Sequence, residues 1–241
     1  MKKYFNWTNI RIVLLIGVMV FLYSFTSKRN NHRNLIQSQV IFIDENGAFI
    51  EQETVNKLLI ENNEDVKSIK KVEVNLNKLE KNINSNPMIE KSEVYLTVDG
   101  VLKAKVKQKK PIARVFSNNE SFYIDYNGNK MPLSESFTAR VPIVSGEIHK
   151  NFKNDFHKLL QFVYEDDFLK KNIIGIQVFS NGSIRMKSRN HDFIIEFGKA
   201  QNIETKFANY KAFFQKTSQD NSIAKYKIIN LIYTQQVVCT K

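Results

Sequence analysis

Apolar residues form one unbroken run early in the chain and shorter periodic groups after it. The uncharged run covers residues 12–27 and lies between Arg11 and Lys28. A helix of this length spans about 24 Å, and long basic side chains at its two ends can reach the edges of a hydrocarbon core about 30 Å thick. The pattern predicts a transmembrane helix over residues 12–27, with residues 1–11 as a cytoplasmic tail.

A cleavable signal peptide and a buried core helix are the alternatives to a membrane anchor. The run has no polar face, which argues against a core helix. No Ala-x-Ala-like cleavage site follows Tyr23, which favours a retained anchor. Each flank carries three basic residues, so charge does not decide the orientation. The short tail and the large following domain favour a cytoplasmic amino terminus and an extracytoplasmic domain.

A small α/β unit is predicted over residues 38–110, after a polar tether over residues 28–37. The order of its elements is strand, helix, helix, strand, strand. The patterns are a strand from Val40, helices marked by Val55, Leu58, Leu59 and by Leu76, Leu79, Ile83, and a hairpin around Asp99-Gly100.

The hairpin alternates apolar and polar positions. We expect one face to pack on the two helices, and the other face to be basic and solvated. The expected core face is Val94, Leu96, Val98, Leu102, Ala104 and Val106, and the basic face is Lys103, Lys105 and Lys107. The basic face serves solvation alone or touches a membrane surface.

A second unit is predicted over residues 111–241, mostly antiparallel β with two helices. Pro111 marks the boundary because it lacks a donor for a β ladder. The expected elements are hairpins at Asn127-Gly128 and Asn181-Gly182, a short strand from Val141, a strand over Phe193–Phe197, a helix with Phe152, Phe156, Leu159, Leu160 and Val163, a helix with Ile203, Phe207, Tyr210 and Phe214, and a last strand over Lys225–Tyr233. The fold class is therefore α+β.

The net charge of +12 is unevenly distributed. Residues 1–43 hold six basic residues and no acid, which suits anionic lipid headgroups around the apolar run. The rest of the chain lacks a clustered basic face with stacking aromatic residues, so nucleic-acid binding is not expected. The single cysteine, Cys239, excludes an internal disulfide.

Side chains suited to catalysis do not form a recognisable group. The four histidines, His32, His149, His157 and His191, have no metal-ligand spacing. The acidic run over residues 165–167 is typical of a solvated helix end, since adjacent residues point apart. We expect no enzymatic activity, no cofactor, no metal and no small-molecule substrate.

The order of these segments resembles the FtsQ/DivIB family of bacterial cell-division proteins, whose first exported unit is a POTRA domain. The similar segments are Leu79-Glu80 with Asn86-Pro87, Val106 to Ala113, Tyr123-Ile-Asp125 with Gly128, Val141-Pro142 with Gly146, Phe197-Gly198-Lys199, and Ile229 to Tyr233. Each match is weak alone, but together they cover nearly the whole chain. Asn230 and Ile232 replace an Asp and an Arg that the family has in the last strand.

The resemblance implies a non-catalytic scaffold of the division machinery at the septum, in the inner (cytoplasmic) membrane. Such proteins bind the single-span proteins FtsB/DivIC and FtsL and support septal peptidoglycan synthesis. The alternatives are a membrane-anchored envelope enzyme and a POTRA protein of outer-membrane assembly or secretion.

In this family the partner adds a strand to the sheet edge near the carboxy terminus. We expect Ile229 and Leu231 to face the core and the other face of the last strand to meet the partner. The implied partner-binding residues are Lys199, Tyr226, Ile228, Asn230, Ile232 and Tyr233. The alternative is a last strand that is core on both faces, covered by the last helix.

Overall fold

The computed structural model describes residues 7–43, 49–61, 65–117, 120–147 and 153–241. The chain divides into two compact units. The first contains residues 1–45 and 50–108, and the second contains residues 46–49 and 109–241.

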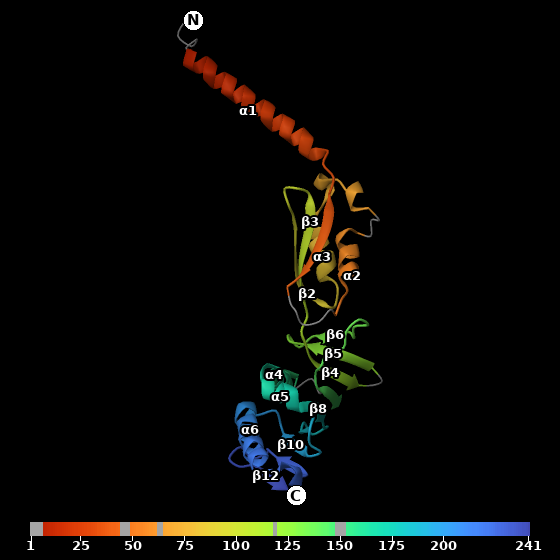
Figure 1. Ribbon diagram of the computed structural model, residues 1–241, viewed down its shortest axis with the longest axis vertical. Helices are drawn as coiled ribbons and strands as arrows, with labels where there is room; N and C mark the ends of the chain where they lie inside the picture. Colours follow the sequence, from red (N-terminus) through yellow and green to blue (C-terminus); the bar gives the residue numbers. More distant parts are fainter. Residues whose placement is uncertain (1–6, 44–48, 62–64, 118–119, 148–152) are drawn as a thin grey trace. The chain divides into compact units, whose positions relative to one another are not determined.

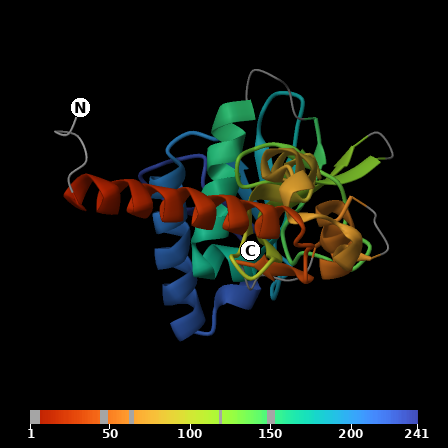
Figure 2. The ribbon, with the colours of Figure 1, turned by 90° about the horizontal axis from the view of Figure 1, so that it is seen from above.

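The apolar run forms one long helix, α1, over Trp7–Asn31 (Figures 1 and 2). None of its residues is buried, and it is long and apolar enough to cross a membrane. It is the one such helix in the described part of the chain.

The segment expected to be a polar tether is mostly ordered by other elements. Its first residues, up to Asn31, continue α1. The Leu35 amide donates to the Ile69 carbonyl at 2.9 Å, and Leu35 is buried in the core of the first unit. The segment differs from a free linker because apolar burial and backbone pairing hold it on the domain.

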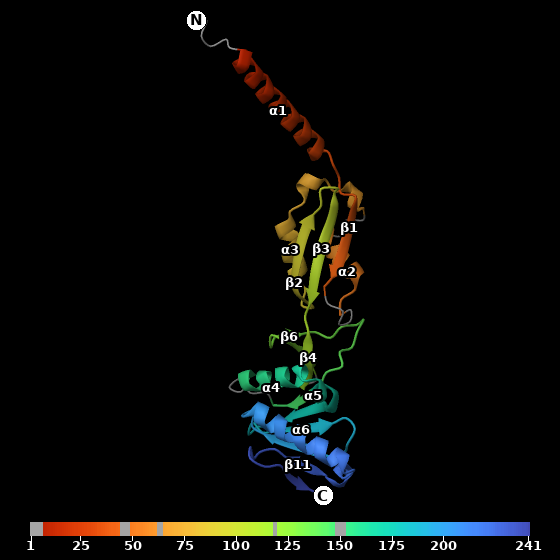
Figure 3. The ribbon, with the colours of Figure 1, turned by 60° about the vertical axis from the view of Figure 1, so that its left-hand side comes forward.

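The first unit has the predicted order of elements (Figure 3). They are β1 Gln37–Phe42, α2 Gln52–Leu59, short 3₁₀ helices η1 Val66–Ser68 and η2 Lys71–Glu73, α3 Leu76–Asn84, β2 Ile89–Leu96 and β3 Val101–Gln108. The sheet order is β1-β3-β2, with β1 parallel and β2 antiparallel to β3.

The predicted helix faces and hairpin face meet in the core of this unit. Val55, Leu59, Leu79 and Ile83 from the helices are buried with Leu102, Ala104 and Val106 from β3. Asn75 caps α3, because its side chain accepts from the Lys78 amide at 3.1 Å.

The hairpin differs from the prediction at its tip. Val98 was expected on the core face but is 82% exposed, because β2 ends at Leu96 and Val98 lies in the turn. The turn is longer than two residues: the Thr97 amide donates to the Val101 carbonyl, and Gly100 adopts a positive φ of 93°.

On the basic face, the three lysines differ in their surroundings. Lys105 is exposed and lies over the Tyr95 ring, whereas Lys103 and Lys107 are half-buried. Lys107 pairs with Glu90 at 2.8 Å. Part of the expected positive charge is therefore neutralised within the unit.

The second unit is a nine-stranded sheet with three α-helices in its described part. Its elements are β4 Pro111–Ser117, β5 Glu120–Asp125, β6 Lys130–Met131, β7 Ile143–Gly146, α4 Lys153–Glu165, α5 Asp167–Asn172, β8 Ile173–Val178, β9 Ile184–Ser188, β10 Ile194–Gly198, α6 Ile203–Gln219, a 3₁₀ helix η4 Ile223–Lys225, β11 Ile228–Asn230 and β12 Val238–Thr240. The strand order is β12-β11-β10-β9-β8-β7-β4-β5-β6.

Antiparallel pairs outnumber parallel pairs in this sheet, as predicted. The predicted helix residues Phe156, Leu159, Leu160, Val163, Phe207 and Tyr210 are buried in its core, and Phe214 is half-buried against it. Phe152, also predicted for α4, lies outside the described residues.

The last predicted strand is wrong in its extent, and three elements were missed. Residues 223–225 form η4, and the strand is limited to Ile228–Asn230. The missed elements are β4, α5 and β12. β4 has seven residues but no alternation of apolar and polar positions, and α5 and β12 have only six and three residues.

Candidate partner-binding edge

The sheet of the second unit ends in β12, and no described strand pairs with the outer side of β12. On its inner side β12 runs antiparallel to β11, with Ile228 opposite Thr240, Ile229 opposite Cys239 and Asn230 opposite Val238. A strand at the end of a sheet presents backbone donors and acceptors that a further strand can pair with. The candidate partner-binding residues lie on or near the strands next to this edge: Ile228 and Asn230 on β11, Tyr226, Ile232 and Tyr233 close to its two ends, and Lys199 directly after β10.

The direction of the free groups follows from the pairing of β11. Its other side runs parallel to β10: the Leu231 amide donates to the Glu196 carbonyl, and the Ile194 amide donates to the Lys227 carbonyl. Backbone groups alternate in direction along a strand, so Ile228 and Asn230 face β12. Val238 and Thr240 then face β11, and the N–H and C=O of Cys239 point to the open edge.

β11, where the last strand was expected, is therefore not the edge strand. It lies between β10 and β12, and Ile229 and Leu231 face the core as predicted, at 0% and 1% exposure. The expected outer residues Ile228 and Asn230 are half-buried within β11. The prediction missed β12 and so assigned the free edge to the neighbouring strand.

Asn230 and Gly198 position the segment that follows β11. The Asn230 Oδ1 accepts from the Ile232 amide at 2.9 Å and forms a local turn. Gly198 has a positive φ of 73°, and a Cβ there would lie 3.0 Å from Cγ1 of Ile232. Two residues of the predicted set, Asn230 and Ile232, are thus brought into contact.

Large apolar side chains are exposed around this turn and on β12. Ile232 is 51% exposed, Tyr233 56% and Val238 42%. Tyr226 behaves differently: it is half-buried and its ring packs edge-on against Phe213 of α6 at 5.3 Å. Tyr226 precedes β11 and therefore does not follow the alternation of that strand.

Lys199 is exposed directly after β10, and its backbone carbonyl accepts a hydrogen bond from a second, buried lysine. Lys206 of α6 is 4% exposed, and its Nζ donates to the carbonyls of Phe197 at 2.8 Å and Lys199 at 3.0 Å. Burial lowers the pKa of Lys206. The role of Lys206 is not evident from the sequence, because a lysine at the start of a helix is ordinarily solvated.

Cys239, on β12, is half-buried against the core. Burial raises the pKa of its thiol, so the neutral thiol is the favoured form. Among the described residues, no group of three or more His, Cys, Asp or Glu side chains is arranged to hold a metal ion.

The acidic run was expected at a solvated helix end, but two of its members have structural partners. Glu165 accepts from the Tyr126 hydroxyl. Asp166 caps α5 by accepting from the amides of Phe168 and Leu169, and it pairs with Lys211. Burial acts to raise the Asp166 pKa, but the Lys211 and backbone hydrogen bonds outweigh it and lower the pKa.

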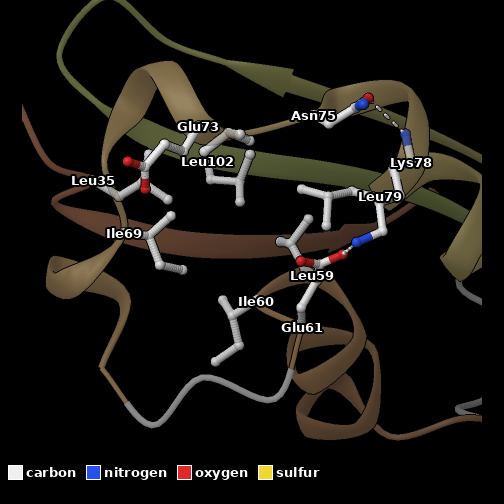
Figure 4. A pocket seen from close by; sticks show the side chains of 11 residues that line it. Leu35, Leu59, Ile60, Glu61, Ile69, Glu73, Asn75, Lys78, Leu79 and Leu102 are labelled. Carbon is white, nitrogen blue, oxygen red and sulfur yellow. Dashed lines mark hydrogen bonds and ion pairs between the residues drawn. The ribbon is translucent and has the colours of Figure 1, made fainter. Parts of the chain in front are cut away.

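The first unit has a small pocket of about 100 Å³ between α2, α3 and the sheet (Figure 4). Its walls combine apolar side chains, among them Leu35, Leu59 and Leu102, with the polar Glu61, Glu73, Asn75 and Lys78. Lys78 at the rim pairs with Glu61 at 2.6 Å. The volume suits one aliphatic side chain better than a cofactor.

Comparison with protein-family models gives two matches. Residues 39–107 match the POTRA-like domain, and residues 110–240 match the model "FtsQ/DivIB, C-terminal related". A comparison with curated proteins gave no match.

The fold and these matches define a cell-division scaffold with one candidate membrane helix and a POTRA-like unit. The chain belongs to the FtsQ/DivIB family. Members of this family are generally non-catalytic division proteins.

Proposed function

We propose that this protein is a bitopic scaffold of the bacterial divisome that binds FtsB/DivIC-like and FtsL-like proteins through the open edge of its second unit. The amino terminus is cytoplasmic and both folded units are extracytoplasmic. The protein lies in the inner membrane at the septum, supports septal peptidoglycan synthesis and has no catalytic activity of its own.

The observation that carries the proposal is the outward direction of the Cys239 backbone groups on β12. A partner segment in extended conformation gains main-chain hydrogen bonds at such an edge, whatever its side chains. The exposed Ile232, Tyr233 and Val238 supply apolar area beside that edge. Exposed apolar groups next to unpaired backbone groups are typical of a docking site.

The predicted residues take two roles in this proposal. Ile232 and Tyr233 contact the partner directly, and Lys199 meets a partner carboxylate. Ile228 and Asn230 act through position, because they hold β12 and the following turn in place. Tyr226 supports the edge through its contact with Phe213.

A proline at position 239 tests the edge directly. Cys239→Pro removes the outward N–H and puts a ring where the added strand would lie, while the inward bonds of Val238 and Thr240 remain. Cys239→Ala keeps the amide and is the matched control. Both full-length variants are assayed in detergent against the extracytoplasmic segments of the host's FtsB/DivIC-like and FtsL-like proteins.

We expect Cys239→Pro to weaken binding at least tenfold and Cys239→Ala to leave it unchanged, with equal circular dichroism spectra. If Cys239→Pro bound the partner segments as tightly as the wild type does, the binding site would lie elsewhere than at β12. If the wild type bound neither partner segment, alone or in combination, the proposed function itself would be rejected.

A further inference from the structure

Three of the four exposed large apolar side chains in the described part of the first unit, α1 apart, lie at one end of it. Outside α1, the exposed large apolar residues in the described part of this unit are Ile36, Ile43, Val72 and Val98. Ile36, Val72 and Val98 are 57%, 52% and 82% exposed.

Hydrogen bonds hold the segments that carry these three residues side by side. The Ile36 amide donates to the Gly100 carbonyl at 2.9 Å, in the turn that contains Val98. Lys71, next to Val72 in η2, donates from Nζ to the Val98 carbonyl at 3.1 Å. We call Ile36, Val72 and Val98, with the charged residues around them, the juxtamembrane patch.

The patch lies close to the end of the apolar helix along the chain. α1 ends at Asn31, and Ile36 follows five residues later, so the two are separated by at most about 18 Å. The intervening segment is attached to the same end of the domain: the Lys71 amide donates to the Arg33 carbonyl at 2.9 Å, and the Asn34 Nδ2 donates to the Lys67 carbonyl at 2.8 Å.

Basic side chains predominate around the patch and at the end of α1. They are Lys28, Arg29, Arg33, Lys67, Lys70 and Lys71, and the acids in the same described segments are Asp65, Glu73 and Asp99. Asp65 is engaged in capping the Lys67 amide at 2.9 Å, and Glu73 pairs with Lys70 at 3.0 Å. Apolar tips bordered by lysine and arginine match the chemistry of an anionic membrane surface.

We propose that the juxtamembrane patch rests on the surface of an anionic bilayer. Ile36, Val72 and Val98 enter the headgroup layer, and the surrounding lysines meet lipid phosphates. The contact fixes the first unit against the membrane from which it emerges. The inference requires that α1 crosses the membrane, but it does not depend on partner binding by the second unit.

Depth-dependent quenching in nanodiscs tests this contact in the full-length protein. A fluorophore is attached to Val98→Cys in a Cys239→Ala background, so that one thiol is labelled. Ser85→Cys in the same background is the matched control, because Ser85 is exposed and lies beyond the far end of β2. The eight residues of β2 span about 26 Å, which puts the control well above the headgroups.

In discs containing phosphatidylglycerol, we expect a nitroxide attached to the lipid headgroup region to quench the Val98 label at least threefold more than the Ser85 label. Neutral phosphatidylcholine discs, or the double variant Lys67→Gln, Lys70→Gln, should at least halve that excess.

Equal quenching at the two positions would overturn the proposal, because the patch would then lie in water. If the excess quenching of the Val98 label were the same in neutral discs and in the lysine double variant, recognition of anionic lipid would be rejected. A Val98 label shielded from aqueous quencher only after a partner protein is added would replace the membrane by a protein interface.

Discussion

The outer strand β2 of the first unit and the outer strand β12 of the second present opposite kinds of edge. β2 exposes the charged Glu90, Lys91 and Glu93, and Lys91 pairs with Glu93 at 3.2 Å. β12 consists of Val238, Cys239 and Thr240 and carries no charge. Charged side chains on an edge oppose the addition of another strand. The difference indicates that charge protects β2 against pairing with a further strand, whereas β12 lacks this protection.

The two units also have separate hydrophobic cores, one around α2, α3 and β3 and the other around α4, α6 and the long sheet. A core substitution should therefore weaken one unit and leave the other folded.

Phe207→Ala should destabilise the second unit by about 3–5 kcal/mol, since Phe207 is fully buried and stacks on Phe162 at 5.5 Å. Hydrogen exchange followed by mass spectrometry should show faster exchange throughout β8–β11 and unchanged exchange in β2 and β3. Leu79→Ala is the reciprocal control in the first unit. Loss of protection in both units from either variant would contradict separate cores.

Giving β12 the charge of β2 should close the edge. Val238→Lys with Thr240→Lys places two charges on exposed side chains, so we expect partner binding at least tenfold weaker and a change in unfolding free energy below about 0.5 kcal/mol. The neutral pair Val238→Thr with Thr240→Val is the control. If the charged and neutral double variants bound the partner equally well, charge on the edge strand would not control partner binding.

Gly198→Ala should cost about 1–2 kcal/mol, because an alanine at a φ of 73° is strained and its Cβ meets Ile232. Gly175→Ala is the control: a Cβ there would be in ordinary contact with the Lys187 side chain, at 3.5 Å. Thermal unfolding compares the two. Equal unfolding midpoints for the two variants would show that the backbone at position 198 accommodates a Cβ without loss of stability.

Asp166→Ala should cost about 1 kcal/mol through the lost cap of α5, and Asp166→Asn, which keeps a capping oxygen, should cost less. The folded-state pKa of Asp166 is lowered, so the ionised carboxylate stabilises the fold at pH values above its unfolded pKa of about 4. That contribution is lost as the pH falls through the folded-state pKa. The gap between wild type and Asp166→Asn should therefore narrow under acid conditions in chemical denaturation, and a constant gap would contradict the ionic contribution.

The sequence predicted the first unit more completely than the site. The helices marked by Val55 and by Leu79 show a clear 3.6-residue period, and the β2–β3 hairpin pairs residues close in sequence. Val98 was misplaced because strand alternation was extended into a turn.

The edge was harder to predict because its order depends on contacts that are distant in sequence. β11 joins β10 in parallel more than thirty residues along the chain, and β12 has only three residues with no apolar period. Ile229 and Leu231 were identified as core residues by alternation alone, but alternation does not indicate whether one more strand follows. The burial of Lys206 could not be predicted from the sequence, because it depends on two carbonyl groups that only the folded chain brings close to its side chain.

The most direct test of the central claim is residue-resolved amide exchange of β12 in the full-length protein, with and without the FtsB/DivIC-like partner. We expect exchange at the outward Cys239 amide to slow at least tenfold on binding, and exchange at the Val238 and Thr240 amides, which face β11, to change little. Full partner binding with unchanged exchange at Cys239 would contradict strand addition at this edge.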